Sequence, residues 1–310
     1  MRKRDVISAV SASLLFLSIG SYASAEEEIK EPSETKIFID GKKVDFTDVK
    51  PTTINDVLMV PIRTLQSDLD TEVKWDNKEK KIISFKKGEN QTTKVVYQLN
   101  SNYIFHEYQY GPNTVTRVEK IEGPVEQVEN RSLVPLLAAT ESLGYIVDWD
   151  KERNTVRITT NEDIQPVQNK NQYKVYGDYS KIKPIELDVF YLTNAERIKA
   201  GVSSLAYDVE NGEVARLKSK DFHDKEYFDH NSPTYGTPFE MIEKFGISYK
   251  SAGENIAAGF KNAQDTVDKW MDSESHKENI LREEFNRMGV GYYEGENKYK
   301  RYYTQIFTSK

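Results

Sequence analysis

Two of the chain's four histidines, and one glutamate, lie in short polar stretches of the C-terminal part. The stretches are His230-Asn-Ser-Pro-Thr-Tyr-Gly, Ala-Gly-Glu254-Asn-Ile-Ala and Trp-Met-Asp-Ser-Glu-Ser-His276-Lys-Glu-Asn-Ile-Leu. Two imidazoles and a carboxylate brought together can hold a divalent metal, or pass a proton at neutral pH. We therefore take His230, Glu254 and His276 as candidate catalytic residues. The same three with Glu274 are the candidate ligands of a divalent metal such as Zn²⁺.

Amphipathic helices and two β-rich segments are predicted to position these side chains. Four helices are expected: after Pro184, from an N-cap at Asp208, over 238–245 and over 263–271. The β-rich segments follow at 288–293 and 301–307. Helices first and an antiparallel hairpin last predict an α+β fold, with His230 and His276 both on loops.

In this order and spacing, the stretches resemble the bacterial, cysteine-free branch of the CAP superfamily (cysteine-rich secretory proteins, antigen 5, pathogenesis-related 1; SCP-like). The resemblance covers about 184–310 and implies a three-layer α–β–α sandwich with His230, Glu254 and His276 lining the family's cleft. Eukaryotic members place a cleft histidine and a second acid where this chain has Tyr302 and Ser273. The resemblance therefore leaves the second carboxylate open between two neighbours, Asp272 and Glu274.

A purely structural role is the alternative for these residues. His230, Glu254 and His276 would then form a hydrogen-bonded network that holds the loops together, and no ligand would enter. His223 lies seven residues before His230 and is interpreted as a solvated helix residue.

Residues 58–83 recur without gaps at 132–157, with Val60-Pro61 matching Val134-Pro135 and Trp75 matching Trp149. Each copy predicts a helix followed by a β-rich segment. The pattern resembles the N-terminal, stalk-like domain of copper amine oxidases, in which an antiparallel sheet packs on a helix. It covers 36–161 and implies no copper, because that domain stands apart from the family's copper chemistry.

The remaining segments predict export and a two-domain layout. A basic start, a short apolar stretch and Ala23-Ser-Ala25 indicate a signal peptide over 1–25, which leaves no transmembrane anchor after cleavage. Residues 26–35 are expected to be a flexible leader, 36–161 the smaller α+β repeat domain, 162–183 a linker and 184–310 the CAP domain.

Composition excludes several classes of function. Removal of residues 1–25 moves the net charge from −7 to −9, and an acidic exported protein is a poor nucleic-acid binder. With no cysteine there is neither a disulfide nor a nucleophilic thiol. The chain has no Gly-x-Ser-x-Gly elbow and no His-Glu-x-x-His helix, which weakens an enzymatic interpretation.

Three functional hypotheses follow, and whether the protein is an enzyme stays open. The favoured one is a secreted, envelope-associated protein whose cleft binds a small molecule, a lipid, a wall fragment or a metal. The second is a metal-dependent hydrolase of peptide or peptidoglycan bonds. The third is an interaction or signalling protein whose acidic surface meets a partner.

Overall fold

The computed structural model describes residues 34–88, 91–128, 130–160 and 172–310. The predicted signal peptide lies outside the described residues, as does the leader up to residue 33. In the described part, helices and sheets are mixed, which confirms the α+β class. Within the same ranges, no helix is both long and apolar enough to cross a membrane.

The two copies of the repeat form the same local structure. The first contains β3 (Thr52–Ile54), β4 (Val57–Pro61), α1 (Ile62–Leu65), β5 (Glu72–Asp76) and β6 (Lys81–Lys87). The second contains β10 (Glu126–Val128), β11 (Arg131–Pro135), α2 (Leu136–Thr140), η1 (Glu141–Leu143), β12 (Tyr145–Asp150) and β13 (Thr155–Thr160). Structural equivalence therefore extends past the recurring sequence at both ends.

The copies meet along their Val-Pro strands. β4 and β11 pair antiparallel, and Val60 lies opposite its own repeat equivalent, Val134. On either side, Met59 pairs with Pro135 and Pro61 with Leu133, so each copy contributes the same strand to the contact. The repeat is thus folded as a local two-fold arrangement centred on the buried Val60–Val134 pair.

The hairpins of the two copies join different sheets. The β5–β6 hairpin pairs through β6 with β7 (Thr92–Gln98), whereas the β12–β13 hairpin pairs through β13 with β1 (Lys36–Ile39). The β1–β13 pairing is parallel, so the expected antiparallel sheet contains one parallel pair. β1 turns into β2 (Lys42–Lys43) through Asp40-Gly41, both with positive φ, as a two-residue type I′ hairpin turn requires.

Trp75 and Trp149 occupy equivalent positions, opposite Ile82 and Val156. Both rings pack against the apolar core of the repeat half, yet both are only partly buried. A core-packing role of the repeated tryptophan predicts largely buried rings, whereas each ring lies at the margin of its core.

A ten-stranded sheet runs through much of the described chain, in the order β16-β18-β17-β15-β14-β9-β8-β7-β6-β5. Its further strands are β8 (Tyr103–Tyr110), β9 (Asn113–Lys120), β14 (Gln172–Tyr176), β15 (Ala206–Asp208), β16 (Ser251–Ala258), β17 (Arg287–Glu294) and β18 (Arg301–Ser309). β14 falls inside the interval expected to be a linker and pairs with both β9 and β15. The first ten residues of that interval lie outside the described ranges, and the domain boundaries stay a prediction.

The helices of the C-terminal part are η2 (Tyr179–Lys181), α3 (Pro184–Lys199), α4 (Val209–Asp224), α5 (Pro238–Lys244), α6 (Ala263–Met271) and α7 (Glu274–Leu281). The four from α3 to α6 begin where the sequence indicated, whereas η2 and α7 were not predicted. The Asp208 carboxylate accepts the backbone N–H of Asn211 and caps α4. Thr237 and Glu240 form a capping box at the start of α5.

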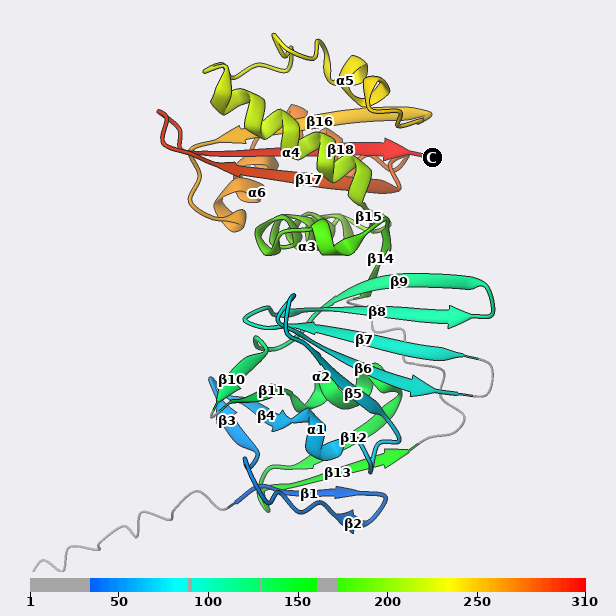
Figure 1. The fold of residues 1–310 in the computed structure, drawn as a ribbon. Helices are drawn as coiled ribbons and strands as arrows, with labels where there is room; N and C mark the ends of the chain where they lie inside the picture. Colours follow the sequence, from blue (N-terminus) through cyan, green and yellow to red (C-terminus); the bar gives the residue numbers. More distant parts are fainter. Residues whose placement is uncertain (1–33, 89–90, 129, 161–171) are drawn as a thin grey trace, which may run out of the picture. The chain divides into compact units, whose positions relative to one another are not determined.

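Helices cover both faces of the strands β16, β18 and β17 (Figure 1). Alternate residues of β18 divide between the faces: Tyr303 and Phe307 pack with α3 and α6, whereas Ile306 packs with α4 and α5. This period of two is that of a strand buried on both sides. The expected α–β–α sandwich is therefore observed.

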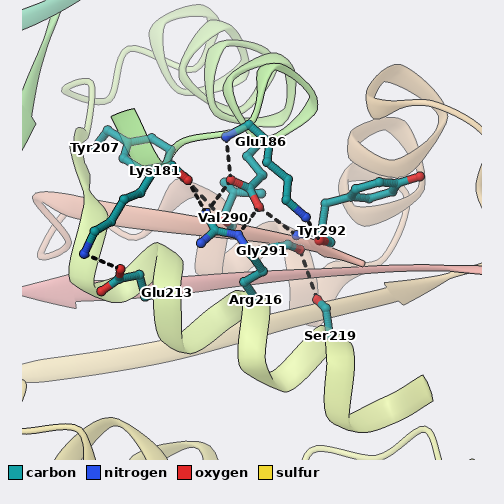
Figure 2. A network of polar contacts seen from close by, with 10 residues as sticks. Lys181, Glu186, Tyr207, Glu213, Arg216, Ser219, Val290, Gly291 and Tyr292 are labelled. Carbon is teal, nitrogen blue, oxygen red and sulfur yellow. Dashed lines mark hydrogen bonds and ion pairs between the residues drawn. The ribbon is translucent and has the colours of Figure 1, made fainter. Parts of the chain in front are cut away.

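A buried ion pair joins the start of α3 to α4 and β17 (Figure 2). The Glu186 carboxylate is fully buried and accepts hydrogen bonds from Arg216 Nε and Nη2 at 2.8 and 2.7 Å. It also accepts the backbone N–H groups of Lys183 and Tyr292. Loss of Glu186 would leave these donors unsatisfied, which makes the pair a specific link between three elements.

Helix α4 approaches β17 very closely. A Cβ atom at Gly289 would fall on the backbone of Asn211 and Gly212, and one at Gly291 on the backbone of Ala215 and Arg216. Backbone atoms cannot rotate away as a side chain can, so only glycine fits at these two strand positions.

We expect Gly291→Ala to destabilise the protein by about 3 kcal/mol or more, because the added methyl group must displace α4. Gly123→Ala is the matched control, since a Cβ atom there would meet Val57 at an ordinary 3.4 Å. Urea denaturation of both variants checks this. Equal midpoints for the two would contradict the close approach.

Candidate functional site

Glu254 lies on β16, a strand that the sequence analysis did not predict. β16 is the edge strand of the ten-stranded sheet, and Glu254 pairs with Ile306 of β18. Paired residues point to the same face, so Glu254 faces the α4 side. Its carboxylate is 3% exposed, which makes it a buried charge that needs a partner.

His230 supplies that partner from the loop after α4. Its Nδ1 lies 2.7 Å from Glu254 Oε1, while the imidazole is 52% exposed. The carboxylate is thus held within the protein, and the ring reaches it from the surface. The predicted loop position of His230 is confirmed.

The pair changes the protonation of His230. The hydrogen bond from its ring to Glu254 raises the pKa of His230, against the opposing effect of partial burial. A raised pKa means that the protonated ring stabilises the fold below its ordinary pKa of about 6.5. This contribution is lost as the pH rises through the folded-state pKa.

His276 lies on α7, a helix that packs with α3 and α6 and contacts β16. It lies in the first turn of α7, so the expectation of a loop past α6 is wrong. Asn255 donates to the His276 backbone carbonyl at 3.0 Å, and Asn279 donates to the Glu254 carbonyl at 3.2 Å. These two hydrogen bonds connect α7 to β16, the strand that carries Glu254.

Burial lowers the pKa of His276, and the charge of nearby His230 lowers it further. His276 is therefore neutral at pH 7, and its effect on stability has the opposite sign. That contribution is present above about pH 6.5 and is lost as the pH falls through the depressed pKa. The pKa values of the two imidazoles are thus shifted in opposite directions.

Two polar atoms of this site have no hydrogen-bond partner among the described residues. They are Glu254 Oε2 and His276 Nδ1, and both are buried. Buried polar atoms are normally paired, so an orphaned acceptor and an orphaned ring nitrogen are unusual and lack the partners that such atoms need.

The other predicted residues lie outside this arrangement. Glu274, the first residue of α7, and Asp272 are exposed, and Tyr302 is buried with its hydroxyl on Asn297. Across the described ranges, no group of three or more His, Cys, Asp or Glu side chains is arranged to hold a metal ion. His106 is buried in β8 and its Nε2 lies 2.8 Å from Glu119 Oε2, so it is a hydrogen-bonded strand residue.

Two charged residues of α4 position the loop that carries His230. Asp221 accepts hydroxyl hydrogen bonds from Tyr227, Ser232 and Thr234, at 2.8, 2.6 and 2.6 Å. One turn earlier, the buried Lys218 ammonium donates to the backbone carbonyl of His230. The loop is thus fastened to the helix on both sides of His230.

Sequence reasoning missed Lys218 and Asp221, although a signal was present. Both stand on the same helix face as Val214, Ala215 and Phe222, where the amphipathic pattern calls for apolar residues. A charged residue on a core-facing stripe needs a buried partner, and here the partners are groups of the loop.

Comparisons with known proteins agree with this architecture. Residues 190–307 match the cysteine-rich secretory protein family (CAP), and residues 38–158 and 115–198 match the copper amine oxidase N-terminal domain. Two proteins of Bacillus subtilis are similar in sequence. They are the uncharacterized protein YkwD, 53% identical over 115 residues, and the uncharacterized membrane protein YlbC, 33% identical over 125 residues.

Coverage of these relatives is partial. The matches span 37% and 40% of this chain, and 45% and 34% of the relatives. The chain therefore spans less than half the length of either relative.

Solved structures were matched as well. An extracellular SCP-domain protein of Bacillus anthracis shares 18% identity over 86% of this chain and 98% of that one, with a TM-score of 0.38. An outer surface protein of Borrelia burgdorferi shares 20% identity over 42% of this chain and 96% of that one, also with a TM-score of 0.38.

Glu254→Gln should lower the pKa of His230 toward about 6.5, because it removes the charge and the acceptor that favour the protonated ring. NMR titration of the imidazole carbon-bound protons measures this. The His223 signal is the internal control, since its ring contacts Asp224 and Tyr293 instead. An unchanged His230 titration would contradict the pairing.

Asp221→Ala should also lower the pKa of His230, although Asp221 does not touch the ring. The variant frees three hydroxyl groups of the loop and should cost about 1–3 kcal/mol of stability. Asp224→Ala is the control, because this exposed residue lies on the same helix and bonds only to Lys220 and His223 in the described structure. If both variants leave His230 unaltered, Asp221 does not position the loop.

Proposed function

We propose that this protein is exported to the cell envelope. Its chain carries a domain of the cysteine-rich secretory protein family behind a copper amine oxidase N-terminal domain. Its cleft, formed by His230, Glu254 and His276, binds a small polar ligand such as a wall fragment. The N-terminal sequence supports export, and the cleft supports binding.

The observation that carries the proposal is the pair of orphaned atoms. Glu254 Oε1 is occupied by His230, whereas Oε2 is buried without a donor among the described residues. His276 is neutral, so its orphaned Nδ1 can accept or donate a hydrogen bond according to its tautomer. A ligand with a hydroxyl or amide group could satisfy both atoms, and sugars and peptides carry such groups.

Metal-dependent hydrolysis is the second candidate, and the neutral imidazole of His276 favours it. Catalytic zinc normally has three protein ligands and one open position. The described residues do not offer three grouped ligands, and Glu254 could not readily be both a ligand and a general base. We therefore derive no step through a metal, and Zn²⁺ enters as an outcome of the test.

The experiment uses the full chain with soluble muropeptides, and separately with zinc sulfate. Muropeptides at tenfold excess over their Kd should add about 1.4 kcal/mol of stability and shift the His230 and His276 NMR signals. Glu254→Gln and His276→Gln should lose this response. His223→Gln is the matched control and should keep it.

The outcomes separate the candidates. A muropeptide response without cleavage supports the binding proposal. A response to zinc together with muropeptide cleavage, detected by mass spectrometry, establishes the hydrolase instead. If neither muropeptide nor zinc changes stability or the histidine signals, the cleft has only the structural role.

A further inference from the structure

The repeat half contains a hollow that has no part in the arrangement of His230, Glu254 and His276. It has a volume of about 700 Å³ and lies between the β5–β6 hairpin, the start of α1 and the strands β10 and β11. These elements can be followed in Figure 1. Its lining belongs entirely to the repeat half, so it is separate from the His230 cleft.

An aromatic ring on an apolar floor forms one side of this hollow. Trp75 packs against the core and also lines the hollow, where Ile82 and Leu99 lie beside it. A partly exposed indole offers a flat face with negative potential, on which the C–H face of a sugar ring stacks. Asn77 and Gln127, both exposed, add amide groups at the rim.

The rim of the hollow is strongly cationic. Among its described lining residues are four cations, Arg63, Lys74, Lys80 and Arg131, and one carboxylate, Asp48. Arg131 pairs with Asp48 and Lys74 pairs with Glu72, which leaves two cations, Arg63 and Lys80, in excess. The chain as a whole carries a net charge of −7, so this excess is a local feature rather than a consequence of composition.

The second copy of the repeat shows that folding does not need these cations. At the positions equivalent to Arg63, Lys74 and Lys80, it has Leu137, Asp148 and Asn154. Both copies nevertheless form the same strands and the same Trp-bearing hairpin. The tryptophan is common to both copies, whereas the cations are particular to the first.

We propose that this hollow binds an anionic saccharide, a sugar ring that carries a carboxylate or a phosphate. The ring stacks on Trp75 while the acidic group meets Arg63 and Lys80. Neutral sugars lack the second contact and inorganic anions lack the first, so affinity requires both parts of the ligand.

The three tryptophans of the chain make the test direct, because each gives one indole N–H signal in a ¹H–¹⁵N NMR spectrum. The probes are N-acetylmuramic acid for a carboxylate and glucose 6-phosphate for a phosphate. N-acetylglucosamine and inorganic phosphate are the matched controls. We expect the Trp75 signal, assigned with Trp75→Phe, to shift with the acidic sugars at millimolar concentration, and those of Trp149 and Trp270 to stay.

Variants that take their residue from the second copy test the charge. Arg63→Leu combined with Lys80→Asn should weaken binding of the acidic sugars about tenfold, because two exposed cations are removed without loss of Trp75. Trp149→Phe is the control and should leave the affinity unchanged. The preferred probe identifies the acidic group as a carboxylate or a phosphate.

Three results would overturn the proposal. One is equal binding of N-acetylglucosamine, which would make the charge irrelevant. Another is equal binding of inorganic phosphate, which would make the ring irrelevant. The third is an unmoved Trp75 signal with every probe up to about 20 mM, beyond the range of a specific weak site. None of these results depends on His230, Glu254 or His276, so failure of the saccharide proposal would leave the proposed function untouched.

Discussion

The close approach of α4 to β17 is the constraint on which the candidate site depends. Because no Cβ atom fits at Gly289 or Gly291, the helix lies at a fixed height above the sheet. That height places Lys218 and Asp221 where they can hold the loop after the helix. The loop in turn brings His230 to Glu254, whose strand pairs with β18, the neighbour of β17. A contact made only of backbone atoms thus influences the distance between the side chains of His230 and Glu254.

The sequence allowed a good prediction of those parts of the fold that have local signals. Pro184, Asp208 and Thr237 mark helix starts by chemistry that acts within one turn, and the helix over Ala263–Met271 was found with its limits. β16 was missed because Ala252, Gly253 and Ala257 have weak strand propensity, and the strand forms only when β18 pairs with it. α7 was missed because a helix of this length is held by packing rather than by propensity.

The candidate site, too, could be predicted only in part. His230, Glu254 and His276 were identified by residue type, and the structure brings His230 and Glu254 into contact and His276 near them. The opposite shifts of their pKa values were not predictable, because they depend on which ring meets the carboxylate and how far each ring is buried. Glu274 was proposed from its place in the sequence. It is exposed, because the first turn of α7 presents His276 rather than Glu274 to the strand.

The pairing of β1 with β13 has a consequence for association between molecules. β1 covers the edge of the β12–β13 hairpin, where Val156 and Ile158 are buried. Without β1, that edge would present unpaired backbone groups beside apolar side chains, which is the usual template for strand exchange. A chain that lacks β1 would therefore expose the unpaired edge of β13. Its first defect would be self-association, while the contact between His230 and Glu254 would remain.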